Sequence, residues 1–276
     1  MAEIAAMELV AYILFGLLAL GSLLVWQRTA LKLQAGEPLL PLQSRPDDVW
    51  DPIAAFVAAV WVFEQLRVRI FIGIREEPVT IELSGVQQSC MVQLLLLGLL
   101  LSILAWSRRF RLADFGINLR RPYRQAIDGA LGFLASCLPV YAVLLVTQAL
   151  QLRTPETQHS FLKFLEANRD VTSVAWITLS VVIVAPLVEE LVFRLVLQGT
   201  LQVFIPPSWA IVLVAVLFST VHGWPDSLPL FSLALVLGYV YYRRNSYLAV
   251  VVLHAIFNGT NLVFALLLPL SETGGG

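Results

Sequence analysis

Two adjacent glutamates and an arginine lie inside one of the most apolar stretches of the chain, APLVEELVFRLVLQG at residues 185–199. Glu190 and Arg194 are four residues apart, so a helix would let them form an ion pair that neutralises both charges. Glu189 is turned about 100° away from Glu190 on such a helix and lacks this local partner. A second carboxylate in an apolar setting adds desolvation cost without a local benefit, and we therefore expect a chemical role for Glu189.

Further polar side chains occur in the apolar segments that follow, and they can approach Glu189. If the flanking helices form a hairpin at VFIPPSW, Glu189 and His222 both lie ~21 Å from the turn. His254 and Asn258, in the segment HAIFN, project from one helix face because they are four residues apart. A carboxylate, two imidazoles and a carboxamide can together deprotonate a water molecule and hydrogen-bond an oxyanion, as hydrolysis of a peptide bond requires.

Structural interpretations of these residues stay open beside the chemical one. For Glu190 and Arg194 we favour an ion pair that only supports the site. A lone histidine in a helix is usually a packing residue, but two of the three histidines of the chain fall within apolar segments, which favours function. Asn258 alone could join two helices, and Phe218, one turn before His222, could be a core residue or pack beside the imidazole.

The composition places these residues in a membrane protein. Hydrophobic residues make up 58% of the 276 residues and charged residues 13%, with a mean hydropathy of +0.80, whereas about 25% of the residues of a soluble domain are charged. The net charge of -1 leaves no basic excess to neutralise phosphates and argues against nucleic acid as a partner. Cys90 and Cys137 both fall in apolar segments, so we expect neither a disulfide framework nor a cysteine-rich metal site.

About eight apolar segments approach the ~20 residues that span the hydrocarbon of a membrane. The sequence therefore predicts an all-α fold, a polytopic membrane helix bundle with about eight transmembrane helices, as a single domain over 1–276. The arginine cluster at 107–124, together with Arg243 and Arg244, favours the cytoplasmic side for its loops, which predicts both termini outside. The predicted spans are 9–26, 50–66, 86–106, 126–150, 173–201, 208–222, 228–243 and 246–270.

Three motifs in the later segments resemble those of a known family. EELVFR at 189–194, FSTVH at 218–222 and HAIFN at 254–258 match, in order, the EExxxR, FxxxH and HxxxN motifs of the CAAX protease and bacteriocin-processing family, which includes the type II CAAX prenyl endopeptidase. Each motif alone is short, but three in the right order within predicted spans make a strong match. The resemblance covers the catalytic core at roughly 173–262.

The resemblance implies an intramembrane endopeptidase and gives a role to each matching residue. Glu189 would activate a water molecule as general base, and His222 would help to hold or polarise that water. His254 and Asn258 would form the oxyanion hole. The residues that would support the site are Glu190, Arg194 and Phe218.

No cofactor is expected, because the resemblance implies a glutamic protease without a required metal. Glu189, His222 and His254 nevertheless form a His2Glu set that could hold zinc with one open position, so a zinc-dependent intramembrane metalloprotease is the alternative mechanism. The chain lacks an HExxH zinc helix, a GxSxG elbow, a Walker loop and a GxGxxG fingerprint.

The expected partners are membrane lipid and a protein or peptide substrate, which can be lipidated or otherwise associated with the membrane. The expected location is the plasma membrane of a prokaryote, with the chain as a multi-pass integral protein. Two other classes compete with the protease. In a transporter or channel, intramembrane carboxylates and histidines would relay protons. In a non-catalytic membrane scaffold or immunity protein, the same residues would form only a structural polar network.

Overall fold

Eight long helical segments dominate the computed structural model, which describes residues 2–43, 45–46, 48–74, 82–107, 109–152, 164–165 and 168–268. The described residues contain no strand, so the all-α prediction is confirmed. The segments are α1 (Ala2–Gln34), α2 (Pro52–Ile74), α3 (Leu83–Trp106), α4 (Pro122–Ala149), a composite helix over 171–204, α9 (Pro207–His222), α10 (Ser227–Arg244) and α11 (Tyr247–Leu267).

Five of the eight segments are long and apolar enough to cross a membrane, namely α1, α3, α4, the composite helix and α11. Among the other segments, α9 is a shorter apolar helix, and α2 carries charged residues in its second half. Large apolar side chains such as Leu17, Phe56 and Leu95 are exposed around the outside of the bundle. This surface suits contact with lipid, because the backbone polar groups of a helix are hydrogen-bonded within the helix itself. The chain is a polytopic integral membrane protein.

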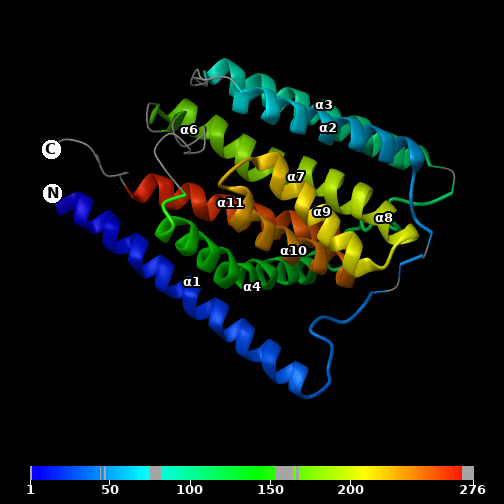
Figure 1. The fold of residues 1–276 in the computed structure, drawn as a ribbon, viewed down its shortest axis with the longest axis horizontal. Helices are drawn as coiled ribbons and strands as arrows, with labels where there is room; N and C mark the ends of the chain where they lie inside the picture. The colour runs from blue at the N-terminus through cyan, green and yellow to red at the C-terminus, as the bar shows by residue number, and fades with distance from the viewer. Residues whose placement is uncertain are drawn as a thin grey trace.

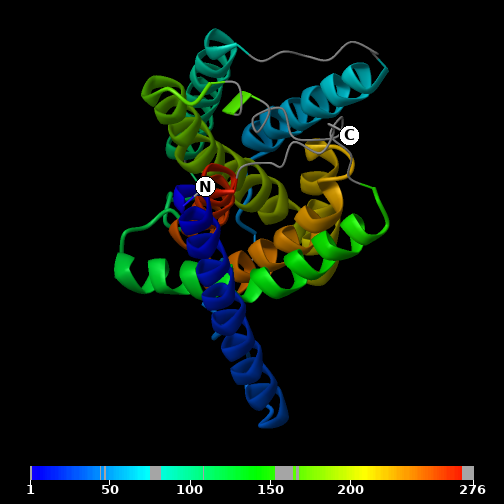
Figure 2. The same cartoon turned by 90° about the vertical axis from the view of Figure 1, so that its left-hand side faces the viewer.

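The helices that carry the polar motifs lie in the middle of the bundle. Figure 1 shows α2 and α3 side by side along one side of the molecule and α1 along the opposite side, where it packs against α4. The turned view shows that the second half of α1 extends away from the other helices (Figure 2). The remaining helices therefore form the core that surrounds the polar residues.

The composite helix combines α-helical turns with wider π-helical turns. Asp170 caps its start, because Oδ1 accepts a hydrogen bond from the Ser173 backbone N–H at 3.0 Å. Hydrogen bonds from the Ser173 side chain and from its backbone N–H lower the pKa of Asp170. Pro186 lies in the first turn of α7 and has no N–H for an α-helical bond, and wide turns run up to this point. The successive parts are α6 (Val171–Thr178), η2 (Leu179–Val184), α7 (Ala185–Glu190), η3 (Leu191–Gln198) and α8 (Gly199–Phe204).

Two glycines allow α4 to pack closely against α11. A Cβ atom added at Gly129 would lie 2.5 Å from the Ala249 carbonyl oxygen, and one added at Gly132 would lie 2.6 Å from Leu253 Cδ1. Within a membrane, helices associate through close packing of small residues rather than through expulsion of water. The two glycines therefore bring α11, with its histidine and asparagine, against the bundle.

We predict that Gly129→Ala lowers the midpoint of thermal unfolding in detergent, because the new methyl group meets backbone that cannot move aside. The expected cost is roughly 1–3 kcal/mol, as for other overpacked positions. Gly98→Ala in α3 is the matched control, since nothing lies within 4 Å of its added Cβ atom, and helix propensity alone should make it neutral or slightly stabilising. Equal midpoints for the two variants would contradict the close packing of α4 on α11.

Candidate active site

The motif residues come from three helices that meet in the core. Glu189 and Glu190 end α7, His222 is the last residue of α9, and His254 and Asn258 belong to α11. α7 packs against α11, and η3, which continues α7, packs against α9 (Figure 1). Residues more than 60 positions apart in the sequence are therefore brought to one place.

Glu190 is the centre of a buried ionic cluster. Its Oε2 accepts a hydrogen bond from Arg194 Nε at 3.1 Å, so the ion pair predicted from their spacing is present. Its Oε1 lies 2.8 Å from His254 Nδ1. The side chains of Glu190 and Arg194 are 0% exposed and that of His254 is 3% exposed. One carboxylate thus joins the composite helix to α11 away from water.

Glu189 faces both imidazoles without a hydrogen bond to either. Its Oε2 lies 3.7 Å from His222 Nε2 and 3.9 Å from His254 Nε2. This oxygen is buried and has no hydrogen-bond partner among the described residues, although 18% of the side chain is exposed. The two neighbouring glutamates therefore differ: Glu190 has both oxygens engaged, whereas Glu189 keeps an acceptor oxygen between two imidazole nitrogens.

Hydrogen bonds at Nδ1 orient both histidine rings toward Glu189. His222 Nδ1 lies 2.6 Å from the Phe218 carbonyl oxygen, which can only accept, so Nδ1 carries the proton. His254 Nδ1 likewise donates to the Glu190 carboxylate. Nε2 of each ring is left for chemistry on the side of Glu189.

Phe218 is a packing centre for the site rather than a core residue remote from it. Its ring is fully buried and lies 4.6 Å from the His222 ring and 5.7 Å from the His254 ring, centre to centre. The Arg194 guanidinium carbon lies 5.2 Å from the Phe218 ring centre, within the range of a cation–π interaction. Phe218 therefore supports three of the polar side chains at once.

Asn258 is held on the neighbouring turn of α11. Its Nδ2 donates to the Val181 carbonyl oxygen in η2 at 2.8 Å, which ties α11 to the composite helix. Nδ2 has a second N–H, so this bond leaves one donor of the carboxamide for another partner. The part of the chain described by the structure shows no hydrogen bond between Asn258 and either glutamate, and its oxyanion role stays a prediction.

Some features near the site were not predicted from the sequence. Arg69 of α2 donates to the Val221 carbonyl oxygen, beside His222, at 2.9 Å. Tyr247 donates to the Leu187 carbonyl oxygen at 2.6 Å and holds α11 against α7. The π-helical turns on both sides of α7 were also missed, although such turns are frequent at functional sites. Pro186, inside the apolar run that contains the glutamates, was the available signal for an irregular helix.

The His2Glu set does not form a zinc shell in the described residues. No group of three or more His, Cys, Asp or Glu side chains is arranged there to hold a metal ion. Tetrahedral zinc with bonds near 2.0–2.1 Å keeps neighbouring ligand atoms about 3.3 Å apart. The distances of 3.7 and 3.9 Å from Glu189 Oε2 to the two imidazoles are longer, and zinc enters no step proposed below.

Comparison with known proteins identifies the region around the site. Residues 171–260 match the family described as type II CAAX prenyl endopeptidase Rce1-like, and the match includes all three motifs. The resemblance stated from those motifs is confirmed over these residues. No curated protein and no solved structure matches the chain.

We predict that Glu190→Gln lowers the free energy of unfolding by about 3–5 kcal/mol, because it leaves the buried Arg194 charge without a carboxylate. Glu189→Gln is the matched control and should cost much less, since Glu189 Oε2 has no hydrogen bond to lose. Thermal unfolding of both variants in the same detergent measures the difference. A larger loss in Glu189→Gln than in Glu190→Gln would reverse the two assignments.

Proposed function

We propose that this protein, whose residues 171–260 match the CAAX protease family, hydrolyses peptide bonds within the membrane by means of a water molecule that Glu189 activates. One observation carries the proposal. Glu189 Oε2 is buried without a hydrogen-bond partner among the described residues and lies between the Nε2 atoms of His222 and His254. A carboxylate oxygen in such a position is available to accept a proton from water.

In the first step, Glu189 accepts one proton of the water while the water oxygen attacks the carbonyl carbon of the scissile peptide bond. His222 assists, because its Nδ1 proton is held by the Phe218 carbonyl oxygen and its Nε2 can accept the second hydrogen bond of the same water. The product of this step is a tetrahedral intermediate with a negatively charged oxygen and a protonated Glu189.

His254 and Asn258 provide the donors for this oxyanion. His254 donates Nδ1–H to Glu190, so it can donate from Nε2 only as an imidazolium, for which the Glu190 carboxylate is the counter-ion. Asn258 supplies the N–H that is not bonded to Val181. Donors fixed in place before the reaction stabilise the developing charge without reorganisation.

Collapse of the intermediate breaks the C–N bond. The leaving amine takes a proton from Glu189, which returns to the carboxylate form, and the other product is a new carboxyl terminus. Glu190, Arg194 and Phe218 keep the rings and the carboxylate in place without touching the substrate. The cycle therefore consumes one water molecule and needs no covalent bond between enzyme and substrate.

The substrate class that suits a site within a helix bundle is a membrane-associated protein or peptide. We assign the protein to the plasma membrane of a prokaryote, since its LADFGINLRRP segment before a membrane span resembles the prelude of bacterial family members.

We predict that Glu189→Gln and His222→Ala each lower cleavage of membrane-associated peptides by about 100-fold or more, because each removes a group that takes part in proton transfer. Purified protein in detergent is tested against a panel of prenylated and unmodified peptides, with and without a strong chelator. Gly98→Ala serves as an active control.

The outcomes separate the alternatives. Cleavage by the wild type that both substitutions abolish and the chelator leaves intact supports the glutamate mechanism. Cleavage that is lost with the chelator and restored by zinc would instead support the metalloprotease mechanism. Absence of cleavage of every peptide by the folded wild type would favour the non-catalytic scaffold.

A further inference from the structure

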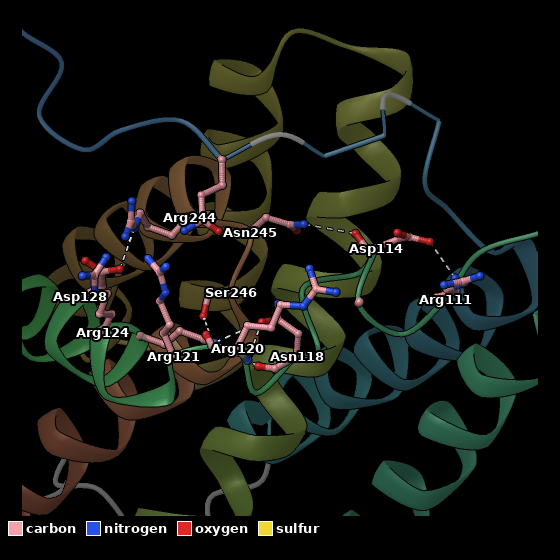
Figure 3. Close-up of a pocket in the computed structure, with 13 residues that line it drawn as sticks. Arg111, Asp114, Asn118, Arg120, Arg121, Arg124, Asp128, Arg244, Asn245 and Ser246 are labelled. Atoms are coloured by element: carbon pink, nitrogen blue, oxygen red, sulfur yellow. Dashed lines mark hydrogen bonds and ion pairs between the residues drawn. The ribbon is translucent and has the colours of Figure 1, made fainter.

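A polar cavity lies apart from the glutamates and histidines, at the end of the bundle where α10 ends and α4 and α11 begin. Its volume is about 450 Å³, within the range of pockets that bind small molecules. Figure 3 shows the side chains that line it, with the arginines at the start of α4 extending toward Arg244 and Asn245. We call it the arginine pocket; its charged lining residues are Arg111, Asp114, Arg120, Arg121, Arg124, Asp128 and Arg244.

The charges of the arginine pocket are not balanced. Five arginines face two aspartates, and both aspartates are already engaged. Asp128 accepts a hydrogen bond from Arg244 Nε at 2.7 Å, and Asp114 accepts one from the Arg111 backbone N–H at 2.8 Å. The guanidinium groups of Arg120 and Arg121 have no carboxylate partner among the described residues.

The backbone that carries these arginines is held by buried hydrogen bonds. Gln125, 6% exposed, donates from Nε2 to the carbonyl oxygens of Asn118 and Arg120 at 3.1 and 2.9 Å. Gln125 Oε1 accepts a hydrogen bond from Ser246 Oγ at 2.5 Å, which joins the start of α4 to the start of α11. The loop is therefore fixed before any ligand arrives, and only the arginine side chains must adjust.

Exposed apolar side chains continue from the pocket along α4. Tyr123 is 59% exposed, Ile127 53% and Leu131 42%, and their spacing of four residues places them on one helix face. Arg124 and Asp128 lie on the neighbouring face of the same helix, at the pocket. A polar site and an apolar stripe thus adjoin at the end of a membrane helix, as the headgroup and acyl chains of a lipid require.

The predicted membrane side of the arginine pocket is consistent with a lipid ligand. The loops that carry the arginine cluster at 107–124, with Arg243 and Arg244, hold the excess of basic residues, which favours the cytoplasmic side. The cytoplasmic leaflet is the one rich in anionic lipids, and basic pockets between helices on that side suit their headgroups. Guanidinium groups also match phosphate oxygens with paired hydrogen bonds.

We propose that the arginine pocket binds the phosphate of an anionic phospholipid headgroup, with the acyl chains along Tyr123, Ile127 and Leu131. Arg120 and Arg121 supply the charge that no carboxylate of the pocket neutralises, and the positive end of the α4 helix dipole adds to it. The ligand is a structural lipid of the bundle, and its binding does not depend on the proposed hydrolysis.

Native mass spectrometry of the full-length protein in detergent tests this proposal, with phosphatidylglycerol or phosphatidylcholine added at equal concentrations. We expect phosphatidylglycerol adducts in preference to phosphatidylcholine adducts, and an affinity about tenfold or more weaker in the double variant Arg120→Gln/Arg121→Gln. The control Arg28→Gln/Arg169→Gln removes the same charge from exposed residues outside the pocket. Thermal unfolding without added lipid checks that both double variants are folded.

Retention of phosphatidylglycerol by the control, with loss in the pocket variant, supports the proposal. Equal loss of phosphatidylglycerol binding in both double variants would show that only the net charge matters and would overturn the proposal. Equal binding of phosphatidylcholine would also overturn it, because a zwitterionic headgroup does not need the surplus arginines. Stabilisation of the wild type by inorganic phosphate alone, to the same extent as by phosphatidylglycerol, would identify a soluble phosphate ligand and contradict a lipid.

Discussion

The Glu190 carboxylate, buried between Arg194 and His254, is the interaction on which the site depends. Each charge alone would be costly in a helix bundle surrounded by lipid, because low-dielectric surroundings do not solvate it. Together they balance their charges, although Nη1 and Nη2 of Arg194 have no hydrogen-bond partner among the described residues, and Phe218 covers the arginine and both imidazoles. The close packing of α11 on the composite helix follows from this need, since without α11 the Glu190 carboxylate would lose its bond to His254, and Phe218 of α9 packs over the cluster.

The same cluster explains why two adjacent glutamates take different roles. Glu190 uses both oxygens to hold the site together, and His254 is thereby turned so that its Nε2 faces Glu189. Glu189 Oε2 has no hydrogen-bond partner among the described residues and faces the two imidazoles. The transition from α7 to η3 occurs directly after these residues, so irregular helix geometry lies where the reactive group must be positioned. Glu190 therefore holds the site together, and its neighbour Glu189 is left for the proposed reaction.

Much of this arrangement could be predicted from spacing and composition. The eight helical segments follow from apolar runs, the Glu190–Arg194 ion pair from a separation of four residues, and the approach of His222 to Glu189 from their equal distance to the Pro206–Pro207 turn. The hydrogen bond from His254 to Glu190 could not be predicted, because it depends on how α11 rotates against α7. The bond from Asn258 to Val181 and the π-helical turns also depend on tertiary packing, which sequence periodicity does not report.

The central claim is that Glu189 activates water and forms no bond to the substrate. A single turnover of a cleavable membrane peptide in ¹⁸O-labelled water, followed by mass spectrometry of the product and of the enzyme fragment that contains Glu189, tests it most directly. Direct attack by water predicts one ¹⁸O atom in the new carboxyl terminus and none in Glu189. Label in the Glu189 carboxylate, with an unlabelled product, would show attack by Glu189 itself and contradict the account.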